Sequence, residues 1–177
     1  MKKFIAFGLA LVCMIGFLGC GSKTSTKDIP AKALSKEEAL LEAAQVYITT
    51  TPEFTATSCV IGNQISAFRL EAGELKKIDY EKYPVFVEDQ VVAFVTCTLG
   101  DAGEYITGCG AKFADSFRQK YAEQPDTPIA LVYAQDGVYL VREGDAPVLL
   151  HEMPIEGCAP IGTLDDCRSS LVYSVIA

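Results

Sequence analysis

The N-terminal segment constrains this chain most, because it decides in which compartment the rest of the chain folds. Lys2 and Lys3 precede an apolar run from Phe4 to Leu18, and Gly19-Cys20-Gly21-Ser22 ends that run. A basic start, a short apolar centre and an exit of small residues are typical of an export signal that is removed from the mature protein. The 15 residues of the apolar run are fewer than the about 20 that a membrane-spanning helix needs. The sequence therefore predicts export.

The signal ends in Phe17-Leu18-Gly19-Cys20. This ending resembles the lipobox of bacterial lipoproteins, in which cleavage occurs before a cysteine that is then acylated. Gly19 and Cys20 match that pattern, whereas Phe17 and Leu18 are bulkier than the family prefers. The resemblance covers residues 1–22 only. It implies that lipid on Cys20 anchors the protein in the cell membrane, facing outside the cytoplasm. Ordinary signal cleavage after Gly21 is the alternative.

Composition divides the remainder of the chain into a tether and one domain. Residues 21–34 mix Ser, Thr, Lys and Pro with few side chains that could be buried, which predicts a disordered tether. The chain beyond it is long enough for one hydrophobic core and too short for two. We therefore expect a signal peptide over residues 1–19, a tether over 20–34 and a single globular domain over 35–177.

The formal net charge of −8 argues against some partners, and loss of Lys2 and Lys3 with the signal would take it to −10. Binding to nucleic acid depends on lysine and arginine side chains that neutralise phosphates, so an acidic domain predicts no nucleic-acid partner. The same charge gives no attraction to anionic lipid. Acyl chains on Cys20 would therefore hold the membrane unaided, which two or more chains can do.

Hydrophobic periodicity predicts an α+β domain. Ser35-Lys36-Glu37-Glu38 fits a capping box and starts a helix that ends at Thr49-Thr50-Thr51-Pro52. Phe113, Phe117 and Tyr121 recur every four residues and predict a second helix from about 111 to 122. Segments with a period of two predict strands over 55–61 and 64–70, joined by a Gly62-Asn63 turn, and over 83–87, 90–99, 104–109, 129–133, 138–141, 148–151 and 171–176.

The strands follow one another as consecutive hairpins, and no strand-helix-strand alternation is present. This order predicts one mainly antiparallel, curved sheet with two helices packed on it. The succession of helix, meander, helix and meander is compatible with a cystatin-like or a profilin-like arrangement, between which the sequence does not choose.

Five cysteines remain once the signal and the lipid-bearing residue are set aside. Cys158 and Cys167 enclose a turn-rich segment that could bring its ends together, which favours a disulfide between them. Cys97 and Cys109 lie on adjacent predicted strands and share a face, so they form a second candidate pair. Cys59 is then left over. Alternatively, all five are free thiols that pack as small hydrophobic groups.

Catalytic and metal-binding patterns are weak. His151 is the single histidine, and the best thiol-hydrolase hypothesis pairs it with Cys109, which precedes the second predicted helix. The cysteines lack the close spacing of zinc sites, and the sequence contains no calcium-binding loop. Gly108-Cys109-Gly110 lacks the Lys-Ser/Thr that would follow in a phosphate-binding loop. We expect no metal ion and no cofactor.

The sequence thus favours a non-catalytic, membrane-anchored lipoprotein whose domain binds a protein or peptide outside the cell. In a narrower version, the 158–167 loop, which carries Pro160, inserts into a partner's cleft as the loops of protease inhibitors do. The simpler interpretation of that segment is a stapled surface loop. The alternative function is an extracytoplasmic thiol hydrolase that uses Cys109 and His151.

Overall fold

The structure, a computed structural model, describes residues 34–55 and 58–176. Cys20, the signal and nearly all of the tether lie outside the described residues. The described residues belong to a compact unit that spans Ala33–Ala177. None of the helices in this part of the chain is long and apolar enough to cross a membrane.

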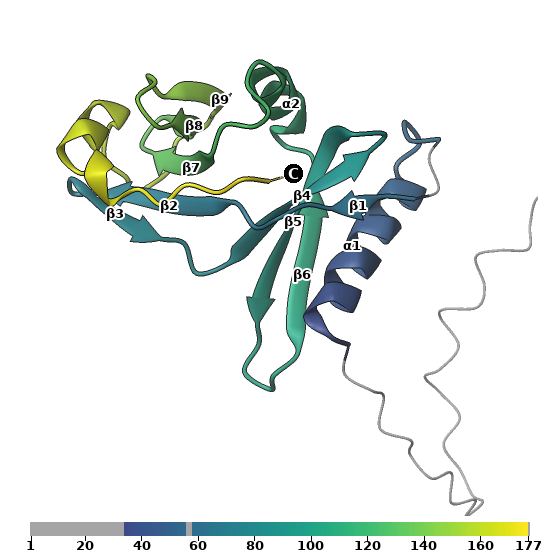
Figure 1. The fold of residues 1–177 in the computed structure, drawn as a ribbon. Helices are drawn as coiled ribbons and strands as arrows, with labels where there is room; N and C mark the ends of the chain where they lie inside the picture. Colours follow the sequence, from purple (N-terminus) through teal and green to yellow (C-terminus); the bar gives the residue numbers. More distant parts are fainter. Residues whose placement is uncertain (1–33, 56–57, 177) are drawn as a thin grey trace, which may run out of the picture. The chain divides into compact units, whose positions relative to one another are not determined.

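The domain has an α+β fold with two sheets, as the sequence predicted for its class (Figure 1). The first sheet has the strand order β1-β4-β5-β6, and the second has the order β3-β2-β7-β8-β9. All neighbouring strands are antiparallel except β2 and β7, which are parallel. The elements are α1 (Lys36–Thr50), β1 (Val60–Ile61), β2 (Ser66–Glu71), β3 (Glu74–Lys77), β4 (Glu81–Val87), β5 (Gln90–Leu99), β6 (Tyr105–Gly110), α2 (Ala114–Ala122), β7 (Ile129–Ala134), β8 (Gly137–Arg142), β9 (Val148–Glu152) and two 3-10 helices, η1 (Ile161–Asp166) and η2 (Arg168–Ser170).

Helix α1 begins with the predicted capping box. The backbone N–H of Glu38 donates to Ser35 Oγ at 3.2 Å, and the backbone N–H of Ser35 donates to Glu38 Oε2 at 2.7 Å. The helix covers one face of the first sheet, where Leu40 and Ile48 are buried against β4 and β5 (Figure 1). An ion pair between Lys36 and a carboxylate of β4, Glu81, fixes the start of the helix to that sheet.

Helix α2 packs on the other face of the first sheet and on one face of the second. Its aromatic stripe forms the core there, as predicted. The ring of Phe117 meets Phe94 of β5 edge-on, with centroids 5.0 Å apart, and Phe113 lies 4.7 Å from the same ring. The helix starts at Ala114, later than the sequence indicated.

The C-terminal segment packs along the second sheet. The backbone of Ser174 exchanges hydrogen bonds with Ile129 of β7, and its hydroxyl lies 2.7 Å from that of Ser66 of β2. On the same side of the second sheet, η1 buries Leu164, which is 1% exposed. The segment was predicted as a strand over 171–176, but in the described residues it forms only an isolated bridge.

One predicted hairpin is wrong. Segments 55–61 and 64–70 do not pair through a Gly62-Asn63 turn, because β1 pairs with β4 and β2 pairs with β3 and β7. The backbone N–H of Gly62 donates instead to Pro84 O, and that of Asn63 donates to Ile176 O. A Cβ at position 62 would lie 2.5 Å from Ile176 O. This glycine therefore permits close packing between segments that are distant in the sequence. The strands form two sheets where the sequence predicted one.

Candidate functional site

The cysteines of residues 34–55 and 58–176 all carry free thiols in the structure. Cys97 lies opposite Thr107, and Cys109 lies opposite Val95, so these two thiols are diagonal neighbours on one face of the first sheet. Diagonal pairs are about 7–8 Å apart between Cα atoms, whereas a disulfide usually requires about 4.4–6.8 Å. A Cys97–Cys109 bond would therefore need a change of register, and it stays a prediction.

The second candidate pair, Cys158 and Cys167, flanks η1. Cys167 follows the last turn of η1, and its thiol points to the carbonyl oxygen of Leu164 at 3.5 Å. Backbone hydrogen bonds of Ala159 to Leu70 and Gln135 hold the segment against the second sheet. The Cys158–Cys167 bond stays a prediction. The packing of the segment on its own domain favours a surface loop over an inhibitor-like projection.

Cys109 and His151 lie on strands of different sheets, β6 and β9. Cys109 follows the pleat of β6 and packs in the cluster below α1, with Cys59 and Cys97. Burial, followed by the influence of Cys59, raises the pKa of Cys109 to about 11, whereas reactive thiols have a lowered pKa. His151 lies opposite Val138 of β8, which belongs to the core between the sheets. The described residues also include no group of three or more His, Cys, Asp or Glu side chains that could hold a metal ion.

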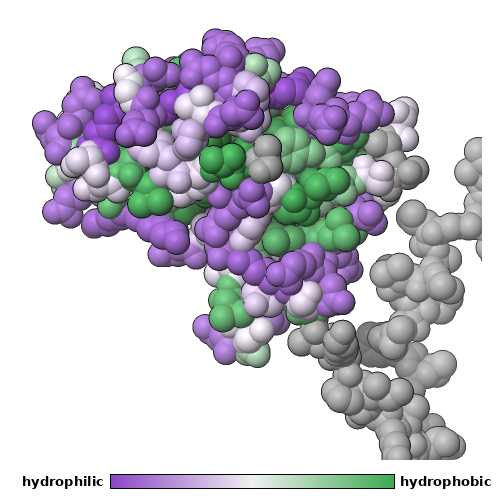
Figure 2. Space-filling model, viewed as in Figure 1, coloured by the Kyte–Doolittle hydropathy of each residue, from purple (hydrophilic) through white to green (hydrophobic). Residues whose placement is uncertain are grey.

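The first concave feature is a groove of about 570 Å³ beside the edge strand β1. Figure 2 shows hydrophobic surface over β1 and the C-terminal segment. Val60 is 67% exposed at this groove, although it belongs to a strand. We call this feature the β1 groove. Its walls are Val60, Ile61, Gly62, Asn63, Phe86, Tyr121, Pro125 and Ile176, and its rim carries Glu88 and Asp89.

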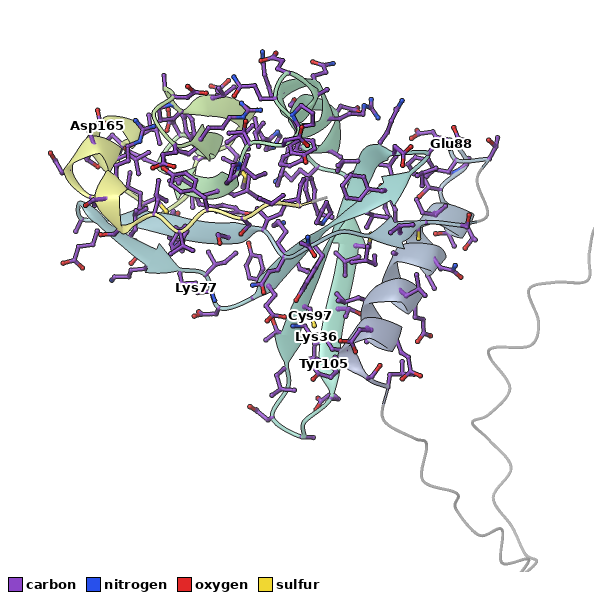
Figure 3. The ribbon with its side chains drawn as sticks, in the orientation of Figure 1. Lys36, Lys77, Glu88, Cys97, Tyr105 and Asp165 are labelled. Carbon is purple, nitrogen blue, oxygen red and sulfur yellow. The ribbon has the colours of Figure 1, made fainter. Side chains whose placement is uncertain are left out.

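The rim of the β1 groove is a tight acidic turn. Glu88 and Asp89 form the two-residue connection between β4 and β5, with φ of 50° and 62°. Two successive positive φ values are typical of the type I′ turn, whose twist matches that of a hairpin. Both carboxylates are exposed, and Glu88 sits at the tip of the hairpin (Figure 3). The groove thus combines an apolar floor with a negative rim.

The second concave feature is a chamber of about 350 Å³ between the two sheets. Register explains why it is hollow. Lys82, Thr96 and Gly108 form one row across β4, β5 and β6, and residues paired in this way point to the same face. Phe94 is paired with Gly110 in the next row. The two glycines of the edge strand leave space where side chains would otherwise lie.

Lys82 is the central residue of this feature, which we call the Lys82 chamber. The lysine is only 7% exposed. Its Nζ lies 5.2 Å from the ring centroid of Phe113, 5.4 Å from that of Phe94 and 5.7 Å from that of Tyr80. Within the described residues, no carboxylate pairs with Lys82, and none lines the chamber.

Burial dominates the chemistry of Lys82. Desolvation lowers the pKa of Lys82 to about 8, because the ammonium ion has lost water and gained no counter-charge. The side chain is still largely protonated near pH 7. The remaining wall of the chamber includes Tyr133 and Lys112, and burial followed by the neighbouring Tyr80 hydroxyl raises the pKa of Tyr133. The chamber therefore combines aromatic walls with a positive charge that no carboxylate of the described residues compensates.

Sequence reasoning missed Lys82 because the predicted strand began one residue later, at Tyr83. The sequence did contain an indication that Lys82 belongs to the strand, because a period of two places Lys82 on the same face as Pro84 and Phe86.

No family model matches the chain, and a search of curated proteins found no relative, so the function must be inferred from these residues.

Proposed function

We propose that the protein is a membrane-anchored extracytoplasmic lipoprotein that acts without catalysis. Its domain binds an extracellular protein or peptide in the β1 groove, and lipid on Cys20 holds it at the membrane. The observation that carries this proposal is the exposed apolar groove with its acidic rim.

The sequence supports the anchor, because Gly19-Cys20 follows an apolar run too short to span a bilayer. The thiol of Cys109 supports a non-catalytic role, because its pKa of about 11 leaves almost no thiolate at neutral pH.

The chemistry of the β1 groove supports a partner with an apolar side chain next to a basic residue. Val60 and Phe86 offer apolar contact area, and burial of such area drives most protein association. Glu88 and Asp89 would meet a lysine or arginine of the partner, which favours fast encounter and correct orientation. The formal charge of −8 favours the same basic partners at longer range.

Photo-crosslinking in whole cells tests the groove. A photoreactive phenylalanine analogue replaces Val60 in the full-length chain, and Ile106 serves as the control position. Ile106 is also apolar and exposed, at 57%, but it lies on β6 outside the groove. We expect one discrete adduct from position 60 and none from position 106. A Glu88→Lys change should weaken the adduct, whereas Glu143→Lys, at an exposed site elsewhere, should not.

Three results would contradict the proposal. They are no adduct from position 60, the same adducts from both positions, and an adduct of twice the chain's mass, which would show self-association instead of a separate partner.

A further inference from the structure

The Lys82 chamber has features that the β1 groove and its partner do not explain. A buried lysine without a counter-charge destabilises a fold, and an apolar side chain of similar length would fill the same position at lower cost. Lys82 keeps its charge among three aromatic rings, and a cavity of about 350 Å³ lies beside it. This volume is at the lower end of the about 300–1,000 Å³ that is typical of small-molecule sites.

The lining of the chamber favours a ligand that carries a negative charge. The amines of Lys82 and Lys112 line the chamber, and the described residues place no Asp or Glu there. This arrangement occurs in a protein whose formal net charge is −8. A negative ligand group in the chamber would supply the partner that the ammonium ion lacks, and charge-assisted hydrogen bonds are stronger than neutral ones.

The other lining residues favour a ligand whose remaining part is apolar. Phe94 and Phe113 are buried, Tyr133 is half-buried, and Val138 and Met153 complete the apolar part of the lining. The absence of side chains at Gly108 and Gly110 keeps the space beside Phe94 open, and a Cβ built at Gly110 would have no heavy atom within 4 Å. The two glycines of Gly108-Cys109-Gly110 therefore keep the chamber open, because a period of two places both of them on the chamber side of β6.

We propose that the Lys82 chamber is a binding site for a small molecule that carries one carboxylate on a flat or aromatic body. The carboxylate accepts hydrogen bonds from the ammonium group of Lys82, and the body packs against Tyr133, Val138 and Met153. The site lies between the sheets, so its ligand is distinct from the partner in the β1 groove.

Calorimetric titration of the full mature chain in a nonionic detergent tests this proposal. The probes are 3-phenylpropionate and 3-phenylpropanamide, which share ring and length and differ in charge, and acetate, which has the charge without the ring. We expect the carboxylate to bind about ten- to a hundredfold tighter than the amide near pH 7, which is the effect of one charge-assisted hydrogen bond. This preference should decrease as pH rises above 8, when Lys82 loses its proton.

Two variants and one control variant locate the binding. Lys82→Met keeps the length of the side chain and should abolish the preference for the carboxylate, whereas Lys77→Met, on β3 (Figure 3), should keep it. Gly110→Val keeps the lysine and fills the chamber, and it should weaken both phenyl probes. The proposal is overturned if the parent does not bind the carboxylate at millimolar concentration, if the amide binds equally well, if Lys82→Met keeps the preference, or if acetate binds as tightly as 3-phenylpropionate.

Discussion

Replacement of Lys82 by methionine should stabilise the domain near pH 7. The lysine is 7% exposed and has no ion-pair partner among the described residues. Its pKa falls from 10.5 to about 8 on folding. At about 1.4 kcal/mol per pKa unit, this change corresponds to a burial penalty of about 3 kcal/mol. Loss of the contacts with three aromatic rings, at about 0.5–1 kcal/mol each, offsets part of the gain. We expect a net increase in unfolding free energy of up to about 1.5 kcal/mol.

The stabilisation by Lys82→Met should decrease as pH rises. Because the folded protein holds the Lys82 proton less tightly than the unfolded chain, the penalty is complete below pH 8. The penalty decreases as pH rises from 8 to 10.5 and disappears above 10.5, where the side chain becomes neutral in both states. The unfolding free energy of the parent should therefore rise by about 2–3 kcal/mol relative to that of the Lys82→Met variant between pH 7 and pH 10.

Urea unfolding at the two pH values measures this difference. The variant and the parent differ only at position 82, so the neighbouring titratable side chains of the chamber, Tyr80, Lys112 and Tyr133, are present in both proteins. Lys77→Met, at an exposed site, should show no such pH dependence. The reasoning is refuted if the Lys82→Met variant is less stable than the parent at pH 7, or if the difference between them does not change with pH.

Three further predictions concern the rest of the chain. Ser35→Ala should lower the unfolding free energy by about 1 kcal/mol, measured by urea unfolding, because it removes the hydroxyl that accepts from Glu38; an unchanged midpoint would contradict this. A chain that starts at Ser35 should unfold cooperatively by itself, and loss of a cooperative transition would show that the boundary is misplaced. His151→Ala should leave the crosslinking yield from position 60 and the alkylation of Cys109 by iodoacetamide unchanged between pH 5 and 9. A thiol that reacts fast near pH 6 only while His151 is present would instead support the hydrolase.

Local signals predicted much of the fold. The capping box at Ser35 identified the start of α1, because both of its hydrogen bonds form within four residues. The meander of β4, β5 and β6 and the strands β7, β8 and β9 were likewise predicted, since each turn joins neighbours in the chain.

Long-range pairing accounts for what could not be predicted. Gly62 suggested a tight turn, but its role is to fit beneath Ile176, a residue far away in the sequence. The strand β3 lies in a segment that was taken for a polar link, because only its pairing with β2 orders it. Lys82 was overlooked for a similar reason. A lysine at a strand end normally indicates solvent, and only the packing of α2 and the second sheet encloses this one.

The intact mass of the mature protein, purified from membranes, tests the central claim of a lipid-anchored domain most directly. We predict a polypeptide that starts at Cys20 and carries the additional mass of two or more acyl chains, together with loss of both the acyl mass and the membrane association in a Cys20→Ser variant. A mature chain that starts at Ser22, with the mass of the bare polypeptide, would contradict the anchor and support ordinary cleavage after Gly21.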